Sequence, residues 1–184
     1  MKISQAIKLR RTIHIFSKKK VPNEVIERSI DAANYAPCHR MTFPWRFTSL
    51  GVNKRELLCQ LHLSLKFGDK PIDEFNLKKI NEKILNPSHL LVATQVRSDN
   101  QVQKLEDYAA CACAIQNLSL SLVADGVGYK WSTGKITRDP NTYQIAEIDP
   151  ILEEIIGFIW IGYSIKEPPL IRRPLLNSIY RERN

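Results

Sequence analysis

The centre of the chain is predicted to be one apolar stretch, Asp107-Tyr-Ala-Ala-Cys-Ala-Cys-Ala-Ile-Gln-Asn-Leu-Ser-Leu-Ser-Leu-Val-Ala-Asp-Gly126. Alanine and leucine, both strong helix formers, dominate it, and no charged residue lies between Tyr108 and Ala124. Asp107 suits the positive end of a helix dipole, and Gly126 suits a left-handed helix cap. The stretch therefore predicts one long, almost wholly buried helix from Tyr108 to Asp125.

A helix that is apolar on all sides is either a core helix or a membrane span. A span needs about 20 apolar residues, whereas this run is shorter and contains Gln116, Asn117, Ser119 and Ser121. The sequence therefore favours a core helix and no membrane partner. The many small residues along it permit close approach of another helix, and a second copy of the chain is one candidate.

Length and composition predict one globular domain, and the cysteines suit the cytoplasm. The 184 residues suffice for one sizeable core, and the apolar and charged fractions (43% and 25%) are typical of soluble globular proteins. No apolar signal-peptide region follows Met1. Cys111 and Cys113 would point apart on a helix, so they cannot share a metal or a disulfide. We expect buried, reduced thiols and a cytoplasmic location.

The net charge of +8 leaves several partners open. The charge could serve binding of nucleic acid, of an anionic membrane surface or of an anionic small ligand. The alternative without a function is a basic surface that is simply solvated. Lys18-Lys19-Lys20 is the only basic run of three. Neither an aromatic-interleaved basic stretch nor zinc-finger spacing occurs, so no nucleic-acid partner is expected.

No motif indicates a side-chain nucleophile or a metal-binding site. The four histidines are scattered, and no G-x-S-x-G, P-loop or G-x-G-x-x-G motif is present. We therefore predict no catalytic residue and no metal ligand. This absence favours an enzyme whose chemistry belongs to a cofactor, or a protein that is not an enzyme.

Hydrophobic periodicity and turn residues predict the remaining elements. Helices are expected at 3–9, 21–36, 54–67, 72–85 and 141–148, strands at 45–50, 89–96 and 155–162, and a strand with a turn over 129–134. Residues 10–16 are expected to be extended. The lysine-rich helix 72–85 is expected to be a mobile surface helix. The tail, residues 165–184, has no hydrophobic period and needs another surface to lie on.

Several motifs, in order along nearly the whole chain, resemble the nitroreductase family. The opening ones are Arg10-Arg11-Thr12-Ile13-x-x-Phe16, Val21-Pro22, Ala32-Ala33-x-x-Ala36-Pro37 and Pro44-Trp45-Arg46-Phe47. Ala114-x-Gln116-Asn117-Leu118 through Gly126-x-Gly128 resembles the family's central helix. Trp131-Ser132-Thr133-Gly134 and Ile156-Gly157-Phe158-Ile159-x-Ile161-Gly162 resemble its later part. The short length resembles the family's small, minimal members.

The resemblance implies an α+β fold, an α/β/α sandwich with a mixed, largely antiparallel central sheet flanked by helices. It implies a single domain, 1–184, a homodimer built on the long central helix, and a tail, 165–184, that wraps on the partner subunit. It further implies FMN as cofactor and NAD(P)H as hydride donor. Hydride would pass through flavin N5 to a nitroaromatic, a quinone or a similar electron-poor small-molecule acceptor.

The resemblance also implies which cations hold the flavin phosphate. Arg10, Arg11 and Thr12 would meet the phosphate and the ribityl chain, since arginine makes bidentate contacts to phosphate. Arg172 and Arg173 would reach the phosphate from the tail. The plainer alternatives are a surface arginine pair and a solvated tail.

A second group of residues would, by the same resemblance, lie beside the flavin ring. Trp131, Ser132 and Thr133 would offer backbone and hydroxyl donors near flavin N5 and O4. His39, in the loop between Pro37 and Pro44, would reach the flavin of the opposite subunit. The plainer alternatives are an ordinary strand end and an exposed loop histidine.

Three positions depart from the family pattern. His14 and Ile15 stand where the family often has arginines, and Tyr35 stands where a close minimal relative would carry arginine. These changes leave fewer cations for the flavin. They keep a second hypothesis open: a nitroreductase-fold protein that binds flavin, or none, without reductase activity.

Overall fold

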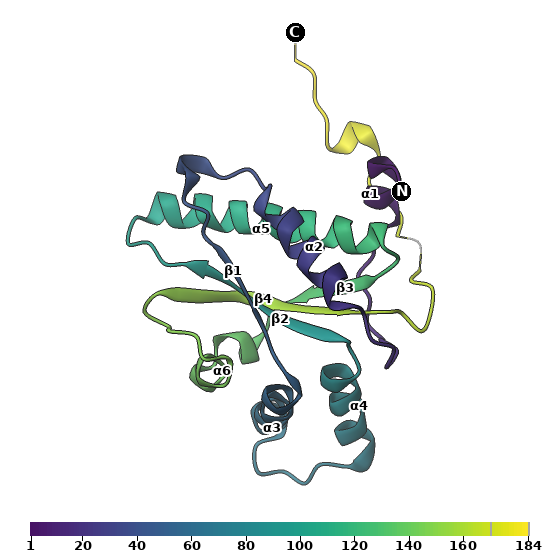
Figure 1. Cartoon of the computed structure of the whole chain (residues 1–184), viewed down its shortest axis with the longest axis vertical. Coiled ribbons are helices and arrows are strands. Elements are labelled where there is room, and N and C mark those ends of the chain that lie inside the picture. Colours follow the sequence, from purple (N-terminus) through teal and green to yellow (C-terminus); the bar gives the residue numbers. More distant parts are fainter. Residues whose placement is uncertain (170, 184) are drawn as a thin grey trace.

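A four-stranded antiparallel sheet forms the middle layer of the molecule (Figure 1). The computed structural model describes residues 1–169 and 171–183. β2 and β4 are the central strands and are almost wholly buried, which explains their continuous apolar sequences. One parallel bridge joins Thr12 to Tyr129, so the expected mixed, largely antiparallel sheet is confirmed. The strand order is β1 (Trp45–Ser49), β2 (His89–Val96), β4 (Glu153–Gly162) and β3 (Gly128–Ser132).

Helices cover both faces of the sheet (Figure 1). Side chains alternate along β2, so Leu91 and Ala93 join one core while Leu90 and Val92 join the other. The α/β/α sandwich expected from the sequence is therefore confirmed. One face carries α1 (Ile3–Leu9), α2 (Asn23–Asn34) and α5 (Gln101–Ala124), and the other carries α3 (Val52–Phe67), α4 (Glu74–Leu85) and α6 (Pro140–Ala146).

The central helix, α5, begins earlier than predicted. Asn100 caps it, since its side-chain oxygen accepts from the backbone N–H groups of Val102 and Gln103 at 3.0 and 3.1 Å. The expectation that Asp107 lies near the helix start is therefore wrong: Asp107 is inside the helix and 4% exposed. Gly126, with a φ of 72°, supplies the predicted left-handed end.

One side of α5 is exposed, so the helix is less buried than predicted. Ala110, Ala114, Leu118 and Leu122 pack into the core, and so does Ser119, which is fully buried. The cysteines differ from expectation in the same way, because Cys111 is buried but Cys113 is exposed. The exposed positions recur at helical spacing and are named here the α5 stripe: Val102, Leu105, Ala109, Cys113 and Gln116.

The lysine-rich helix, α4, packs against α3. The prediction of a surface helix is therefore wrong in one respect, because one side of α4 is part of the core. Ile80 and Ile84 are buried in the core below the sheet. Arg55 of α3 donates from Nη2 to the carbonyl oxygen of Pro87 at 2.7 Å and from Nε to that of Ile84 at 2.9 Å. These bonds join α3 to the end of α4. Burial lowers the pKa of Arg55.

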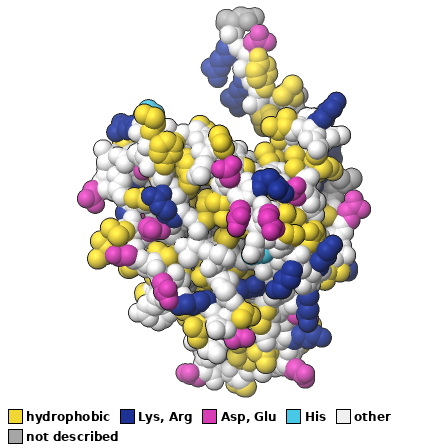
Figure 2. Space-filling model, in the orientation of Figure 1, with side chains coloured by type: hydrophobic (Ala, Val, Ile, Leu, Met, Phe, Trp, Pro, Cys, Tyr) yellow, Lys and Arg dark blue, Asp and Glu magenta, His cyan; other side chains and the backbone are white. Residues whose placement is uncertain are grey.

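The chain after β4 projects from the body (Figure 1) and carries apolar side chains at its surface (Figure 2). Ile171, Leu175, Leu176 and Ile179 are all more than half exposed. Docking of this tail on a partner stays a prediction. Within the described residues, no helix combines the length and apolarity that a membrane crossing requires. The cytoplasmic location likewise stays a prediction.

Candidate functional site

Arg10 lies against the first residues of β3. It ends α1, and its Nη1 donates a hydrogen bond to the phenol oxygen of Tyr129 at 2.8 Å. Its guanidinium carbon is 5.9 Å from the centre of the same ring. The backbone N–H of Ile13 donates to the carbonyl oxygen of Tyr129 at 3.0 Å. The predicted extended segment is therefore tied along the edge strand of the sheet.

Arg11 points back to α1. Its Nη1 donates to the carbonyl oxygens of Lys8 and Arg10 at 2.6 and 2.8 Å. Its Nε is buried and finds no hydrogen-bond partner among the described residues. Thr12, the next residue, is exposed. This corner of the molecule thus holds the Arg10 guanidinium, which is bonded to Tyr129, and the Nε–H of Arg11, which a further acceptor would satisfy.

The end of β3 is held by the neighbouring strand, β4. Trp131 Nε1 donates to the carbonyl oxygen of Ile156 at 3.3 Å, and Ser132 Oγ accepts from Trp160 Nε1 at 2.8 Å. Gly157, with a φ of 155°, lies so close to the indole of Trp131 that a side chain there would collide with it. Thr133 follows and is exposed, so it is open to a ligand.

A pocket of about 410 Å³ opens beside Ser132 and Thr133. Its floor is apolar and includes Phe158 and Trp160. Every ionisable residue that lines it is a base, and no aspartate or glutamate does. We call it the lysine pocket. Its bases come from α3, α4, β3 and the 3-10 helix η2 (Lys135–Arg138): His62, Lys66, Lys83, Lys130 and Lys135.

The bases of the lysine pocket disfavour one another's charge. Burial lowers the pKa of Lys83, and the neighbouring charges of Lys130 and Lys66 lower it further. Burial also lowers the pKa of Lys130. The pKa of His62 falls to about 4 through burial and the nearby Lys83 and Lys66. A bound anion would relieve this repulsion, so the pocket is suited to a negatively charged ligand.

A larger groove, of about 1290 Å³, adjoins the lysine pocket. Thr133 and Thr137 line both cavities. The groove runs between the first turns of α5 and α6, and Tyr108 and Tyr143 are among its lining residues. Unlike the lysine pocket, it is lined by both acidic and basic side chains. A planar ligand at Thr133 would therefore have room on its groove side.

His39 lies beside the N-terminal half of α5, next to Glu106. Its Nε2 is 3.9 Å from Glu106 Oε1, and its ring is exposed. Arg10, in contrast, ends α1, which lies near the C-terminal end of α5 (Figure 1), where Leu122 is in the last turn. Glu106 and Leu122 are about 24 Å apart along the helix axis, at 1.5 Å per residue. One chain therefore does not bring His39 to its own Arg10.

The tail arginines are also not brought to β3 within one chain. Arg172 and Arg173 are exposed, and neither forms a hydrogen bond or ion pair with another described residue. Across residues 1–169 and 171–183, no cluster of three or more potential metal ligands occurs.

The residues predicted for the site thus fall into two groups. Arg10, Thr12, Ser132 and Thr133 lie along one edge of the sheet, whereas the His39 loop and the tail arginines lie elsewhere. Sequence reasoning missed the lysine pocket. Its bases belong to four elements and share no local motif, and only the packing of α3 and α4 brings them together.

Comparisons with known proteins agree with this fold. The model of the nitroreductase family matches residues 7–163. YfhC of Bacillus subtilis (strain 168), whose name assigns it provisionally to the NAD(P)H nitroreductases, is 31% identical over 179 residues, or 96% of this chain and 91% of that protein. The chain therefore belongs to the nitroreductase family, as its motifs indicated.

Solved structures share the architecture. A nitroreductase-like family protein from Bacillus cereus has a TM-score of 0.84 at 24% identity, over 99% of this chain and 96% of that one. A nitroreductase from Bacteroides fragilis NCTC 9343, solved with bound FMN, has a TM-score of 0.75 at 19% identity, over 100% of both chains.

Proposed function

We propose that this protein is an FMN-dependent oxidoreductase that passes hydride from NAD(P)H to a nitroaromatic, a quinone or a similar electron-poor acceptor. Family membership, the name of the Bacillus subtilis relative and the FMN in the Bacteroides fragilis structure support the cofactor and the donor. The observation that carries the proposal is the lysine pocket beside Ser132 and Thr133, which has no acidic lining residue.

The residues present fit FMN. The cofactor has an anionic phosphate, and its ring gains negative charge on reduction. The lysine pocket has the size of a small-ligand site, about 300–1,000 Å³, and combines an apolar floor with bases. Arg10, which bonds to Tyr129, offers donors about 10 Å from Ser132 along β3, at 3.3 Å per residue. The bases of the pocket also supply positive charge that the departures at His14, Ile15 and Tyr35 had put in doubt.

When bound, FMN would supply the hydride chemistry, at N5. The chain's part is to bind and orient the ring. Lys83 and Lys130 would stabilise negative charge beside it, because both line the pocket. Ser132, held by Trp160, and Trp131, held by Ile156, keep the end of β3 rigid, so the donors of Thr133 are presented in one position. No acid or base residue is assigned.

We further propose that two copies complete each site. Arg10 and His39 lie at opposite ends of α5, and the apolar and small side chains of the α5 stripe are exposed. A two-fold axis across the stripe would pair the helices antiparallel, and this pairing moves the His39 loop of each copy to the Arg10 end of the other. The exposed apolar tail, with Arg172 and Arg173, would then lie on the partner.

The test is the visible spectrum of the purified protein. The proposal predicts bound flavin absorption, a mass matching FMN on release, and bleaching by NADH or NADPH without oxygen. The spectrum then recovers when a quinone or nitroaromatic is added. A colourless protein that takes up no FMN on reconstitution would instead support the flavin-less alternative. Bound FMN that neither nicotinamide reduces would support a flavin-binding protein without reductase activity.

A further inference from the structure

The loop that carries His39 has a strained backbone. Arg40, Met41 and Phe43 have φ angles of 59°, 53° and 43°. These lie in the left-handed region, which residues with a side chain rarely adopt. The conformation costs free energy that other contacts must offset, and such strain concentrates at functional sites.

Local hydrogen bonds within the loop region hold this conformation. The backbone N–H of Phe43 donates to Cys38 Sγ at 3.2 Å, so the loop closes on itself. Arg46 Nη1 donates to the carbonyl oxygens of Phe43 and Trp45 at 2.9 and 2.8 Å. These contacts are local, within residues 38–46, and they fix the shape of the loop.

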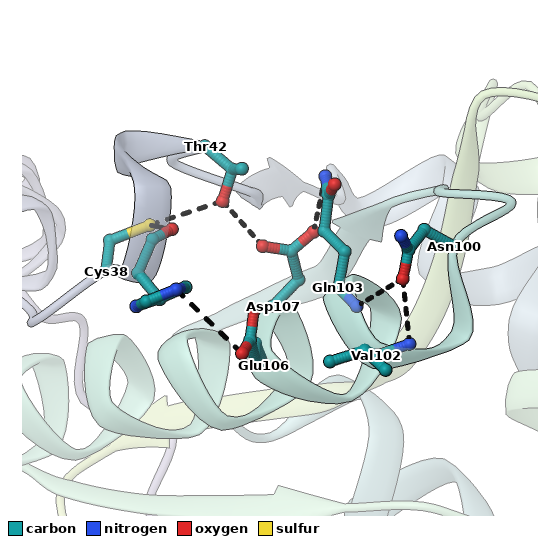
Figure 3. Close-up of polar contacts among 8 residues, drawn as sticks. Cys38, Thr42, Asn100, Val102, Gln103, Glu106 and Asp107 are labelled. Carbon is teal, nitrogen blue, oxygen red and sulfur yellow. Dashed lines mark hydrogen bonds and ion pairs between the residues drawn. The ribbon is translucent and has the colours of Figure 1, made fainter.

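Asp107 of α5 ties the loop to the central helix (Figure 3). Thr42 Oγ1 donates to Asp107 Oδ1 at 2.5 Å and lies 3.3 Å from Cys38 Sγ. Gln103 Nε2 donates to the other carboxylate oxygen at 3.5 Å. Asp107 is 4% exposed, and among the described residues no base forms an ion pair with it. A buried carboxylate without a cation is costly, so packing alone does not explain its presence on a core face.

The loop directs its free side chains away from its own core. His39, Arg40 and Met41 are exposed, and Met41 is 75% exposed. Glu106, which faces His39, and Asp107 lie on the same turns of α5 as Leu105 and Ala109 of the α5 stripe. The loop therefore borders the surface on which a second copy would pack.

We propose that Asp107 is a positioning residue that, through Thr42, locks the strained loop so that its His39–Met41 edge enters the flavin site of a second copy. This inference rests on the proposed function, because it requires an FMN site shared by two subunits. Asp107 itself touches neither flavin nor substrate. Asp107 acts on the position of the loop at the moment the flavin binds.

The test compares Asp107→Ala, Asp107→Asn and Thr42→Val in the full-length protein. Trypsin cleavage after Arg40, followed by mass spectrometry, reports opening of the loop. The dissociation constant of FMN and kcat at saturating FMN report its consequence. Ser119→Ala is the matched control, since Ser119 is a fully buried polar residue of the same helix that bonds only within it, to Gln116.

Asp107→Ala should speed cleavage roughly ten- to a hundredfold, because a hydrogen bond to a carboxylate is lost and cleavage follows the open population. FMN affinity should fall by about tenfold while kcat at saturating FMN stays within about twofold, since the chemistry is untouched. Asp107→Asn keeps an oxygen that accepts from Thr42 and should restore both values. Thr42→Val should repeat the alanine result even where Asp107→Ala fails to fold.

Unchanged cleavage in Thr42→Val, or in a folded Asp107→Ala, would overturn the inference. Faster cleavage with unchanged FMN affinity would also overturn it, because the loop would then not serve the flavin. The comparison of FMN affinities presupposes that the wild-type protein binds FMN. Wild-type protein that binds none would overturn the proposed function and the positioning role together, so the two failures are distinguishable.

Discussion

Arg10 donates a hydrogen bond of 2.8 Å to the phenol oxygen of Tyr129, which fixes its guanidinium beside the first residues of the edge strand β3. A guanidinium in one orientation binds phosphate with less loss of side-chain entropy than a free one. The same strand ends at Ser132, beside the lysine pocket. Basic side chains therefore lie at both ends of β3, Arg10 beside its first residues and the lysine pocket beside its last.

Arg10→Ala should weaken FMN binding by about 1.5–3 kcal/mol, or roughly ten- to a hundredfold, because a charge-assisted hydrogen bond to phosphate is lost. Tyr129→Phe should cost less, since the guanidinium remains and only its support is removed. Fluorescence titration of the reconstituted proteins measures both. Arg28→Ala is the control, because Arg28 pairs with Asp125 on the surface at 2.8 Å. Wild-type affinity in Arg10→Ala would remove Arg10 from the site.

Lys83→Met should make the flavin harder to reduce. Loss of a cation beside the reduced ring should shift its midpoint potential by roughly −30 mV, the equivalent of about 1.4 kcal/mol for two electrons. Equilibration with a reference dye measures this shift. Lys78→Met, at a position of the same helix that does not line the lysine pocket, should leave the potential unchanged. Equal potentials in wild type and Lys83→Met would place the flavin ring outside the lysine pocket.

His62 should make the apoprotein lose stability in acid. The pKa of His62 is about 4 in the folded chain and has its ordinary value of 6.5 in the unfolded chain. Between these two pH values the unfolded chain therefore binds more protons than the folded chain. The free energy of unfolding should therefore fall as the pH falls from 6.5 to 4, by roughly 1–3 kcal/mol after allowance for partial exposure.

Urea unfolding across this pH window measures that loss. His62→Gln should flatten this part of the profile, whereas His14→Gln, at an exposed site, should not. The same profile in His62→Gln as in wild type would contradict a neutral, half-buried His62.

Cys113→Glu should lower dimer content and flavin content together. The substitution places a charge on the α5 stripe, where two copies are proposed to pack. Light scattering gives the mass of the particle, and the visible absorbance gives its flavin content. Gln60→Glu adds the same charge at an exposed position of α3 and should change neither. A monomer with full flavin content would refute the shared site.

The fold was predictable from the sequence because its signals are local or periodic. The apolar runs of β2 and β4, Pro37 after α2 and Gly126 after α5 each mark an element or its end. The start of α5 was misplaced because Asn100 and the polar first turns lie outside the apolar run. Asp107 was assigned to the helix dipole, whereas it bonds to Thr42, which is distant in the sequence.

The site was only partly predictable. Arg10 and Thr133 could be named because the family motifs run through them. The lysine pocket could not be, since Lys66, Lys83 and Lys130 converge only after α3 and α4 pack under the sheet. The separation of His39 from Arg10 needs the length and direction of α5, which no single motif encodes. The roles of all these residues stay predictions.

The central claim, that each flavin site is built from two subunits, is tested most directly by mixing two defective chains. One chain carries Arg10→Ala and the other carries His39→Ala with Arg40→Ala, so each homodimer should bind FMN weakly at both sites. A heterodimer would hold one site with both defects and one intact site. We predict wild-type affinity at one FMN per two chains in the isolated heterodimer. A heterodimer that binds FMN no better than the two homodimers would contradict the shared site.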